Sequence, residues 1–396
     1  MKIRGSYGSL GNQVMDNLGN FPYLATYGTN SSYNYLINGS KPVIVKAPGL
    51  VASDFTWETV TQMDFGFDAS FLNNRLTGTF DWYRRNTKDM LVAGATLPAT
   101  LGASVPKSNS ADMKTIGWEL SLGWNDRLEN GFSYWVKGVL SDYQATITKY
   151  AGNDAGFYSQ SDGDGKYYVG QKIGEIWGYH SNGLFQSDDE AATIDQSELY
   201  AGKWGAGDVK YEDLGGGDGK ITKGEETIYN PGDKSIIGNK TPRYQFGITV
   251  GFDYKNFDFE MFWQGTGKRD YMLSGAQFWG FTSQWDVPYT PALDYWTETN
   301  TDAYFPRPGW QNGGNRVTSD RYLQSAAYGR LKNLTVGYTI PKNLTTKWGI
   351  SRLRLYVTGE NLLTITPLND AFDPETLGGL TYPINRKVAI GLNLTL

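Results

Sequence analysis

The sequence predicts an all-β protein whose strands form an antiparallel transmembrane β-barrel. Three observations support this prediction: segments that alternate strictly between apolar and polar residues, aromatic residues on the apolar faces, and connections that alternate between short and long. Side chains in a strand point to opposite faces with a period of two, so alternation gives each strand one apolar and one polar face. About eleven or twelve strand candidates can be marked along the chain, with boundaries that are good to a few residues.

The first part of the chain contains one strand candidate, a stretch with an uncertain number of strands, and a hairpin with a short turn. Lys2–Tyr7 is the first strand candidate, and a stretch from Tyr23 to Val51 follows that holds one or two strands. Thr61–Phe71 and Leu76–Arg84 are the next two candidates, with apolar and polar residues in strict alternation. Asn73 and Asn74 lie between these two candidates, and asparagine tolerates left-handed backbone angles, so the sequence predicts a tight turn there.

The same short-turn arrangement recurs further along the chain. Trp118 to Trp124 defines another strand, and a short turn leads to Phe132–Lys149. Arg243 to Gly265 reads as a hairpin because only Lys255 and Asn256 separate two alternating runs. Long insertions near 150–241 and 266–325 flank this hairpin. The remaining strand candidates are Ala326–Ile340, Ser351–Thr364 and Asn385–Leu396.

Alternation by itself favours a soluble β-sandwich, which also has one apolar and one polar face per strand. Three features reverse that preference. Several strands are about ten residues or longer, which is enough to cross a bilayer at a tilt. Short and long loops alternate, and aromatic residues border the apolar faces. These aromatic residues are Trp82, Trp118, Trp124, Tyr244, Tyr254 and Trp263. In the barrel, Arg354, Tyr356, Thr358 and Glu360 are expected to face the interior.

Composition limits the classes of function. The 396-residue chain has no cysteine and a single histidine, His180, which argues against disulfides, thiolate chemistry, Ser-His-Asp triads and multi-histidine metal centres. A net charge of −5 argues against nucleic acid as a partner. The mean hydropathy of −0.46 suits a barrel with a polar interior and polar loops. No apolar run reaches the length of about 18 residues that a transmembrane helix needs.

The first residues, MKIRGSYGSLGNQ, contain no apolar signal core and read directly as a strand. An outer-membrane protein has to be exported, so we expect this chain to be part of something longer.

Several segments together resemble the SusC/RagA type of TonB-dependent outer-membrane transporters. No single motif is decisive, but the segments occur in the family's order and span nearly the whole chain. They are KIRGSYGSLGNQ, WETVTQMDFGFDASFLNNRLTGTFDWYRRNTKDML, GQKIGEIWGYHSNGLFQS, GDVKYEDLGGGDGKIT, IIGNKTPRYQFGI, FDFEMFWQGTGKRDY, YGRLKNLTVGYTIP, LRLYVTGENLLT and YPINRKVAIGLNLTL.

The resemblance implies a non-enzymatic importer of oligosaccharides or peptides in the outer membrane of a Bacteroidetes-type bacterium. The family's barrel has about 22 strands, a plug domain that the TonB complex pulls on, and a SusD-like surface lipoprotein as a lid. Residues 1–396 then correspond to the C-terminal portion of the barrel, embedded in outer-membrane lipid, with long extracellular loops and with the plug domain absent. The alternatives are a soluble, secreted glycan-binding or glycan-cleaving β-protein and a passive porin.

Aromatic residues in the long insertions are candidates for substrate binding. A flat ring suits the apolar face of a sugar, and nearby polar side chains can bond its hydroxyl groups. The alternatives are that these rings form small cores within the loops or pack against a lid protein. The substrate-binding candidates are Trp177, Tyr179, Trp204, Trp279, Trp285 and Tyr289.

One acidic, glycine-rich loop resembles half of a calcium-binding loop. Asp218 and Glu225 have the spacing of the second half of that pattern, and Gly219 permits the sharp turn. The first half fails because Leu214 stands where a ligand is needed, while Asp213 is one residue out of register. Asp213, Asp218 and Glu225 are therefore the candidate Ca²⁺ ligands, and a glycine turn with solvated acids is the favoured alternative. No other cofactor is expected.

Overall fold

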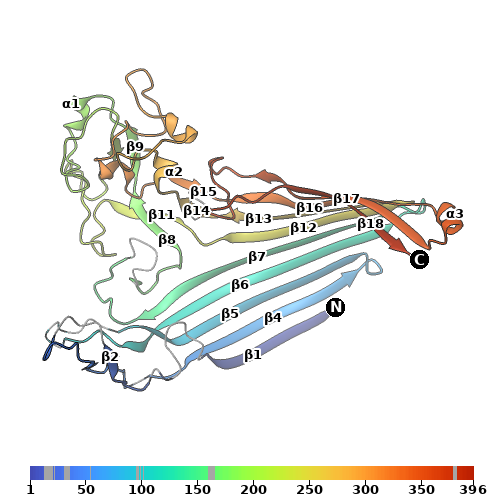
Figure 1. Cartoon of the computed structure of the whole chain (residues 1–396), viewed down its shortest axis with the longest axis horizontal. Helices are drawn as coiled ribbons and strands as arrows, with labels where there is room; N and C mark the ends of the chain where they lie inside the picture. The colour runs from blue at the N-terminus through green and yellow to red at the C-terminus, as the bar shows by residue number, and fades with distance from the viewer. Residues whose placement is uncertain are drawn as a thin grey trace.

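A single antiparallel sheet forms the body of the protein in the computed structural model (Figure 1). The structure describes residues 1–12, 21, 23–30, 36–53, 55–94, 98, 100, 102–158, 166–377 and 381–396. The ten strands of the sheet are, in spatial order, β1 (Lys2–Asn12), β4 (Glu58–Phe71), β5 (Leu76–Ala93), β6 (Lys107–Arg127), β7 (Ser133–Tyr150), β12 (Arg243–Tyr254), β13 (Phe257–Lys268), β16 (Tyr328–Thr339), β17 (Arg352–Ile365) and β18 (Lys387–Thr395). The antiparallel strand prediction is confirmed, with chain order kept across the sheet.

The count of sheet strands is one or two below the expected number. Within its described residues, 23–30 and 36–51, the ambiguous stretch from Tyr23 to Val51 contributes only β2 (Gly28–Asn30) and β3 (Ile44–Lys46), which pair with each other outside the main sheet. Strands of three residues are too short to cross a bilayer, which takes about 9–11 residues. The described part of this stretch belongs to a loop.

The connections sort onto two opposite rims of the sheet (Figure 1). Residues 72–75, 128–132 and 255–256 make tight turns at one end, which we call the turn rim. Asn73 and Lys255 have positive φ values of 56° and 55°, so these turns use the left-handed geometry that asparagine tolerates best. The turn rim also carries α3 (Lys342–Thr345) and the 3₁₀ helix η4 (Thr346–Trp348). All the longer connections leave the opposite end, the loop rim.

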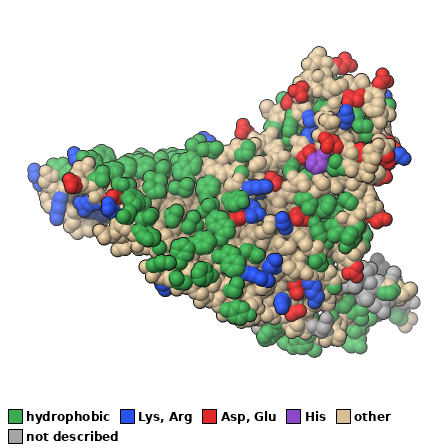
Figure 2. Space-filling model, turned by 180° about the vertical axis from the view of Figure 1, so that it is seen from behind, with side chains coloured by type: hydrophobic (Ala, Val, Ile, Leu, Met, Phe, Trp, Pro, Cys, Tyr) green, Lys and Arg blue, Asp and Glu red, His purple; other side chains and the backbone are tan. Residues whose placement is uncertain are grey.

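One face of the sheet is a continuous apolar surface. Register places Phe252 beside Phe259, Phe259 beside Val336, and Val357 beside Ile390, so the same row runs across neighbouring strands. Figure 2 shows hydrophobic side chains gathered over the sheet, and in the described residues no second sheet covers them. The sandwich alternative is therefore wrong, because an uncovered apolar face this large suits lipid and not water.

The opposite face is polar and is tied together by ion pairs. Arg4 bonds Asp68 at 2.9 Å and Asp81 at 2.8 Å across three strands. Arg354 pairs with Asp258, and the hydroxyl groups of Thr335 and Thr358 lie 2.9 Å apart. Arg354, Tyr356, Thr358 and Glu360 share this face, as predicted.

Glycines on the polar face make room for large rings on the next strand. A Cβ atom at Gly251 would lie 2.2 Å from the indole of Trp135, and one at Gly391 would lie 2.3 Å from the ring of Tyr356. Each ring covers the glycine backbone of the neighbouring strand. The ring fills the space that the glycine leaves open and supports the strand pairing at a residue that has no side chain to pack.

We expect Gly251→Ala to destabilise the sheet by about 1–3 kcal/mol, because the new methyl group displaces the Trp135 ring from its position on the backbone. The measurement is the temperature at which detergent-solubilised protein loses its heat-modifiable band in gel electrophoresis.

Gly138→Ala is the matched control, because Gly138 lies on the neighbouring strand and its new methyl group would meet no atom within 4 Å. Equal melting temperatures for the two variants would contradict the packing role of Gly251.

Candidate functional site

Three of the long connections at the loop rim fold into one body, which we call the loop domain: residues 151–158, 166–242, 269–327 and 366–377 (Figure 1). Three two-stranded sheets pair within it. Its elements are β8 (Glu175–Tyr179), β9 (Ser181–Leu184), α1 (Asp188–Ala191), β10 (Val209–Tyr211), β11 (Lys234–Asn239), β14 (Asp270–Met272), α2 (Ala276–Trp279), η2 (Thr290–Leu293), η3 (Gly313–Arg316) and β15 (Leu323–Ser325).

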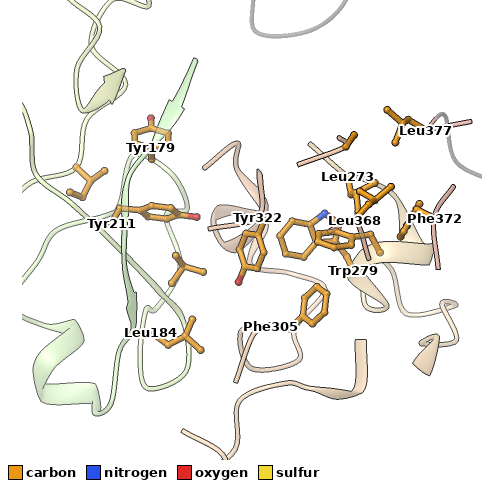
Figure 3. Close-up of a cluster of buried hydrophobic side chains, with 14 residues drawn as sticks. Tyr179, Leu184, Tyr211, Leu273, Trp279, Phe305, Tyr322, Leu368, Phe372 and Leu377 are labelled. Atoms are coloured by element: carbon orange, nitrogen blue, oxygen red, sulfur yellow. The ribbon is translucent and has the colours of Figure 1, made fainter. Parts of the chain in front are cut away.

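An aromatic core holds the loop domain together (Figure 3). The Tyr179 and Tyr211 rings lie 5.5 Å apart, and the Trp279 and Tyr322 rings lie 4.5 Å apart. Phe372 from the third long connection completes the same cluster. Aromatic pairs at these distances contribute about 0.5–1.5 kcal/mol each beyond burial. The three connections therefore share one core.

Buried polar contacts join the first two connections. Asp208 is only 1% exposed and accepts hydrogen bonds from Arg307 at 2.7 Å and from the Asn315 amide at 2.8 Å. The Tyr211 hydroxyl donates to the Gly314 carbonyl at 2.7 Å. Burial raises the pKa of Tyr211 well above its ordinary value, so this hydroxyl keeps the proton that it donates.

The single histidine, His180, links two of the connections. His180 Nδ1 lies 2.7 Å from Asp320 and its Nε2 lies 2.7 Å from Ser235. The backbone supports the same link, because the Tyr179 N–H donates to Thr318 at 2.9 Å.

We expect Asp208→Ala to loosen the contact between the connections, because Arg307 and Asn315 lose their shared acceptor. The cost is about 2–3 kcal/mol, below the about 3–5 kcal/mol for a fully buried pair, because Arg307 is partly exposed. Limited proteolysis, with the cleaved sites in the loop domain identified by mass spectrometry, measures the effect.

Lys203→Ala is the control, since it removes only an exposed ion pair with Asp188 that is worth less than about 1 kcal/mol. If both variants resisted the protease as wild type does, the Asp208 network would not hold the connections together.

The structure divides the six predicted substrate-binding aromatics into packed and exposed residues. Tyr179, 2% exposed, and Trp279 lie inside the core, so no ligand reaches them in this conformation. Trp177 stacks on Tyr158 with ring centres 4.3 Å apart, and Trp204 donates its indole N–H to Tyr200 at 3.0 Å. The loop-core alternative describes these four residues better, because the connections need apolar side chains for a core of their own.

Trp285 and Tyr289 are the two predicted aromatics that stay accessible, at 83% and 46% exposed. Asp286 fixes the turn that presents Trp285, because its carboxylate accepts hydrogen bonds from the backbone N–H groups of Thr282 and Ser283 at 2.7 Å. Hydrogen bonds from the Thr282 side chain and from this backbone lower the pKa of Asp286. We call the segment 285–293 the exposed tip, and it also carries Val287 and Leu293, which sequence reasoning missed.

The predicted calcium ligands are not brought together. Asp213 accepts hydrogen bonds from the backbone N–H groups of Gly219 and Gly217 at 2.8 and 3.0 Å, which lowers its pKa. Asp218 accepts from the Lys220 N–H. Among the described residues no group of three or more acidic or histidine side chains is placed to hold a metal ion, Asp213, Asp218 and Glu225 included. The loop is organised by its own backbone bonds.

A polar hollow of about 510 Å³ lies where the loop domain meets the polar face of the sheet. Arg330 of β16, only 2% exposed, bonds Thr364 at 2.9 Å and Asp373 at 2.5 Å. Gln277, Asp370 and Arg386 also line the hollow. The sequence did not reveal this site, because its residues come from α2, β16, β17 and the connection that follows β17.

Comparison with known proteins assigns the family. The model of the family "TonB dependent receptor-like, beta-barrel" matches residues 1–362. The chain belongs to this family. TonB-dependent receptors of this kind are outer-membrane proteins and not enzymes, so the predictions of location and of a non-enzymatic role are confirmed.

Curated relatives come from the bacterial group that the sequence suggested. TonB-dependent receptor P3 of Formosa agariphila is 30% identical over 430 residues, which cover 99% of this chain and 39% of the relative. TonB-dependent receptor SusC of Bacteroides thetaiotaomicron is 25% identical over 405 residues, which cover all of this chain and 37% of the relative. The chain thus spans about two fifths of the length of these relatives.

Solved structures agree on the fold. A structure of the RagAB peptide transporter superposes with a TM-score of 0.75 at 22% sequence identity, covering 99% of this chain and 40% of the matched chain. The same importer in its "open-open" state gives a TM-score of 0.75. No helix in the described ranges is long and apolar enough to cross a membrane.

Proposed function

We propose that this chain is the C-terminal barrel portion of a SusC/RagA-type importer that uses TonB to move oligosaccharides or peptides across the outer membrane. The observation that carries the proposal is the match of the whole chain to SusC-type receptors, combined with a sheet that is apolar on one face and polar on the other. The polar face is the wall along which substrate passes, and the apolar face contacts lipid.

The edges of the sheet support its assignment to a larger barrel. In the described residues, β1 and β18 each pair with a strand on one side only. Unpaired backbone groups in lipid cost several kcal/mol each, so both edges need partner strands. The much greater length of the relatives supplies room for those strands and for a plug on which the TonB complex pulls.

The polar hollow is the proposed place of first contact with substrate. Arg330, Gln277 and Asp370 offer donors and acceptors at the loop-rim end of the polar wall. Hydroxyl groups of an oligosaccharide and amide groups of a peptide both match such a mixed lining. The solved RagAB transporter handles peptides, and either class of substrate fits this chain.

The exposed tip is the proposed contact for a SusD-like surface lipoprotein. Trp285, Val287 and Leu293 project apolar surface beyond the core of the loop domain. Exposed aromatic and aliphatic side chains of this kind form the centres of protein interfaces.

The proposal is tested by deleting the gene in the native bacterium and measuring uptake of fluorescent oligosaccharides and peptides. We expect uptake of one of these classes to fall to background, both in this strain and in a strain that lacks TonB, while small monosaccharides and amino acids still enter. Uptake that depends on the gene but persists without TonB would instead identify a passive pore.

We expect Trp285→Ala to weaken capture of the lipoprotein by roughly tenfold or more, because a central aromatic anchor is lost. Stability should not change, since the side chain is exposed. Affinity purification of the full-length complex, with the lipoprotein quantified by mass spectrometry, gives the result.

Trp348→Ala is the matched control, because Trp348 is also an exposed tryptophan but lies on the turn rim. Undiminished capture by the Trp285 variant would remove the exposed tip from the interface.

A further inference from the structure

Three basic side chains lie on the apolar face of the sheet at its loop-rim end. Arg84 of β5 is two residues beyond Trp82, and Lys114 of β6 is four residues before Trp118, so each shares a face with its tryptophan. Register places Lys114 beside Thr146 of β7, and Thr146 forms a bridge with Lys172. Lys114 and Lys172 therefore belong to one row, and Arg84 lies diagonally next to Lys114, about 7–8 Å away.

No carboxylate neutralises these three charges. Among the described residues none of them forms an ion pair, and Arg84 only donates to the side-chain oxygen of Asn86 at 3.3 Å. The carboxylate of Glu175 accepts bonds from the Tyr168 hydroxyl at 2.5 Å and from the backbone N–H of Lys172 at 3.1 Å.

Two further acids near this row already have partners. Asp142, which lies beside Trp118, is paired with Arg243. Asp112, two residues before Lys114, accepts a hydrogen bond from the backbone N–H of Asp89 at 2.9 Å. The three positive charges are left for another partner.

The position of the three basic side chains along the strands, relative to the lipid bilayer, indicates what that partner is. Trp82 and Trp118 are direct cross-strand neighbours near the end of the apolar band, where aromatic residues mark the interface between lipid tails and headgroups. Met63 and Ile116 extend the band by one more residue pair. Arg84 lies level with this last apolar pair, and Lys114 and Lys172 lie one residue pair further toward the loop rim, which is the level of the headgroups. Figure 2 shows Lys and Arg side chains between the hydrophobic band and the loop domain.

We propose that Arg84, Lys114 and Lys172 bind the phosphate group of an anionic lipid in the leaflet on the loop side of the membrane. Arg84 offers a planar fork of donors to a phosphate, and the lysines add positive charge on the same side. The two tryptophans pack against the acyl chains of that lipid. This site rests on the outer-membrane location and not on the proposed import, since the substrate path follows the opposite face.

The site is tested with full-length protein purified in mild detergent, stripped of lipid and titrated with phosphatidylglycerol, an anionic phospholipid, while native mass spectrometry counts bound lipid. We expect Arg84→Gln and Lys114→Gln to weaken binding by roughly fivefold each, and the double variant by the product of the two. Phosphatidylcholine, which has no net charge, should bind wild type and variants alike. Lys114→Arg keeps the charge and should keep the affinity.

Arg85→Gln is the matched control, because Arg85 follows Arg84 directly but lies on the polar face beside Gln62. Heat-modifiable bands confirm that each variant is folded. The proposal is overturned if Arg85→Gln weakens lipid binding as much as Arg84→Gln does, or if the double variant binds phosphatidylglycerol as wild type does. It is also overturned if inorganic phosphate at the same concentration displaces the lipid, because the site would then hold any anion.

Discussion

The backbone ladder of the ten-stranded sheet is the constraint on which the rest of the structure depends. In lipid no water is available to an unpaired N–H or C=O group, so each strand must be bonded along its full length to its neighbours. The register that achieves this also aligns apolar side chains in rows, as Phe252, Phe259 and Val336 show. Backbone pairing and lipid exposure are therefore satisfied by the same alignment, and a one-residue slip would turn charged side chains such as Asp258 toward lipid.

The polar face solves a different packing problem. It has no protein layer to fill it in the described residues, so large side chains lie along the wall and not away from it. Trp135 over Gly251 and Tyr356 over Gly391 are examples of this arrangement, and the pair of Arg354 with Asp258 closes another part of the wall. A wall built in this way is polar and charged, as the interior of a transmembrane barrel is.

The strands of the sheet could be predicted from the sequence, but the packing of the loop domain could not, and the reason is physical. Alternation with a period of two is local, so the hairpin of β12 and β13 could be located from its own residues, including the turn at Lys255. Whether an aromatic residue in a long connection is buried depends on segments far away in the chain. Tyr179 packs against Tyr211 while Trp285 points into solvent, and nothing in the neighbouring residues separates these two cases. The polar hollow around Arg330 was missed for the same reason.

The shared core of the loop domain restricts how such a protein can diversify. Tyr211, Tyr322 and Phe372 come from three different connections and fill one interior, so replacing any single connection by that of a relative leaves mismatched surfaces on the other two. A new substrate or partner specificity should then arise by exchange of the complete set of connections in the loop domain, or by substitutions confined to solvent-facing positions such as Trp285. The transmembrane wall below can meanwhile stay the same, because it meets the outer body mainly through the ends of its strands.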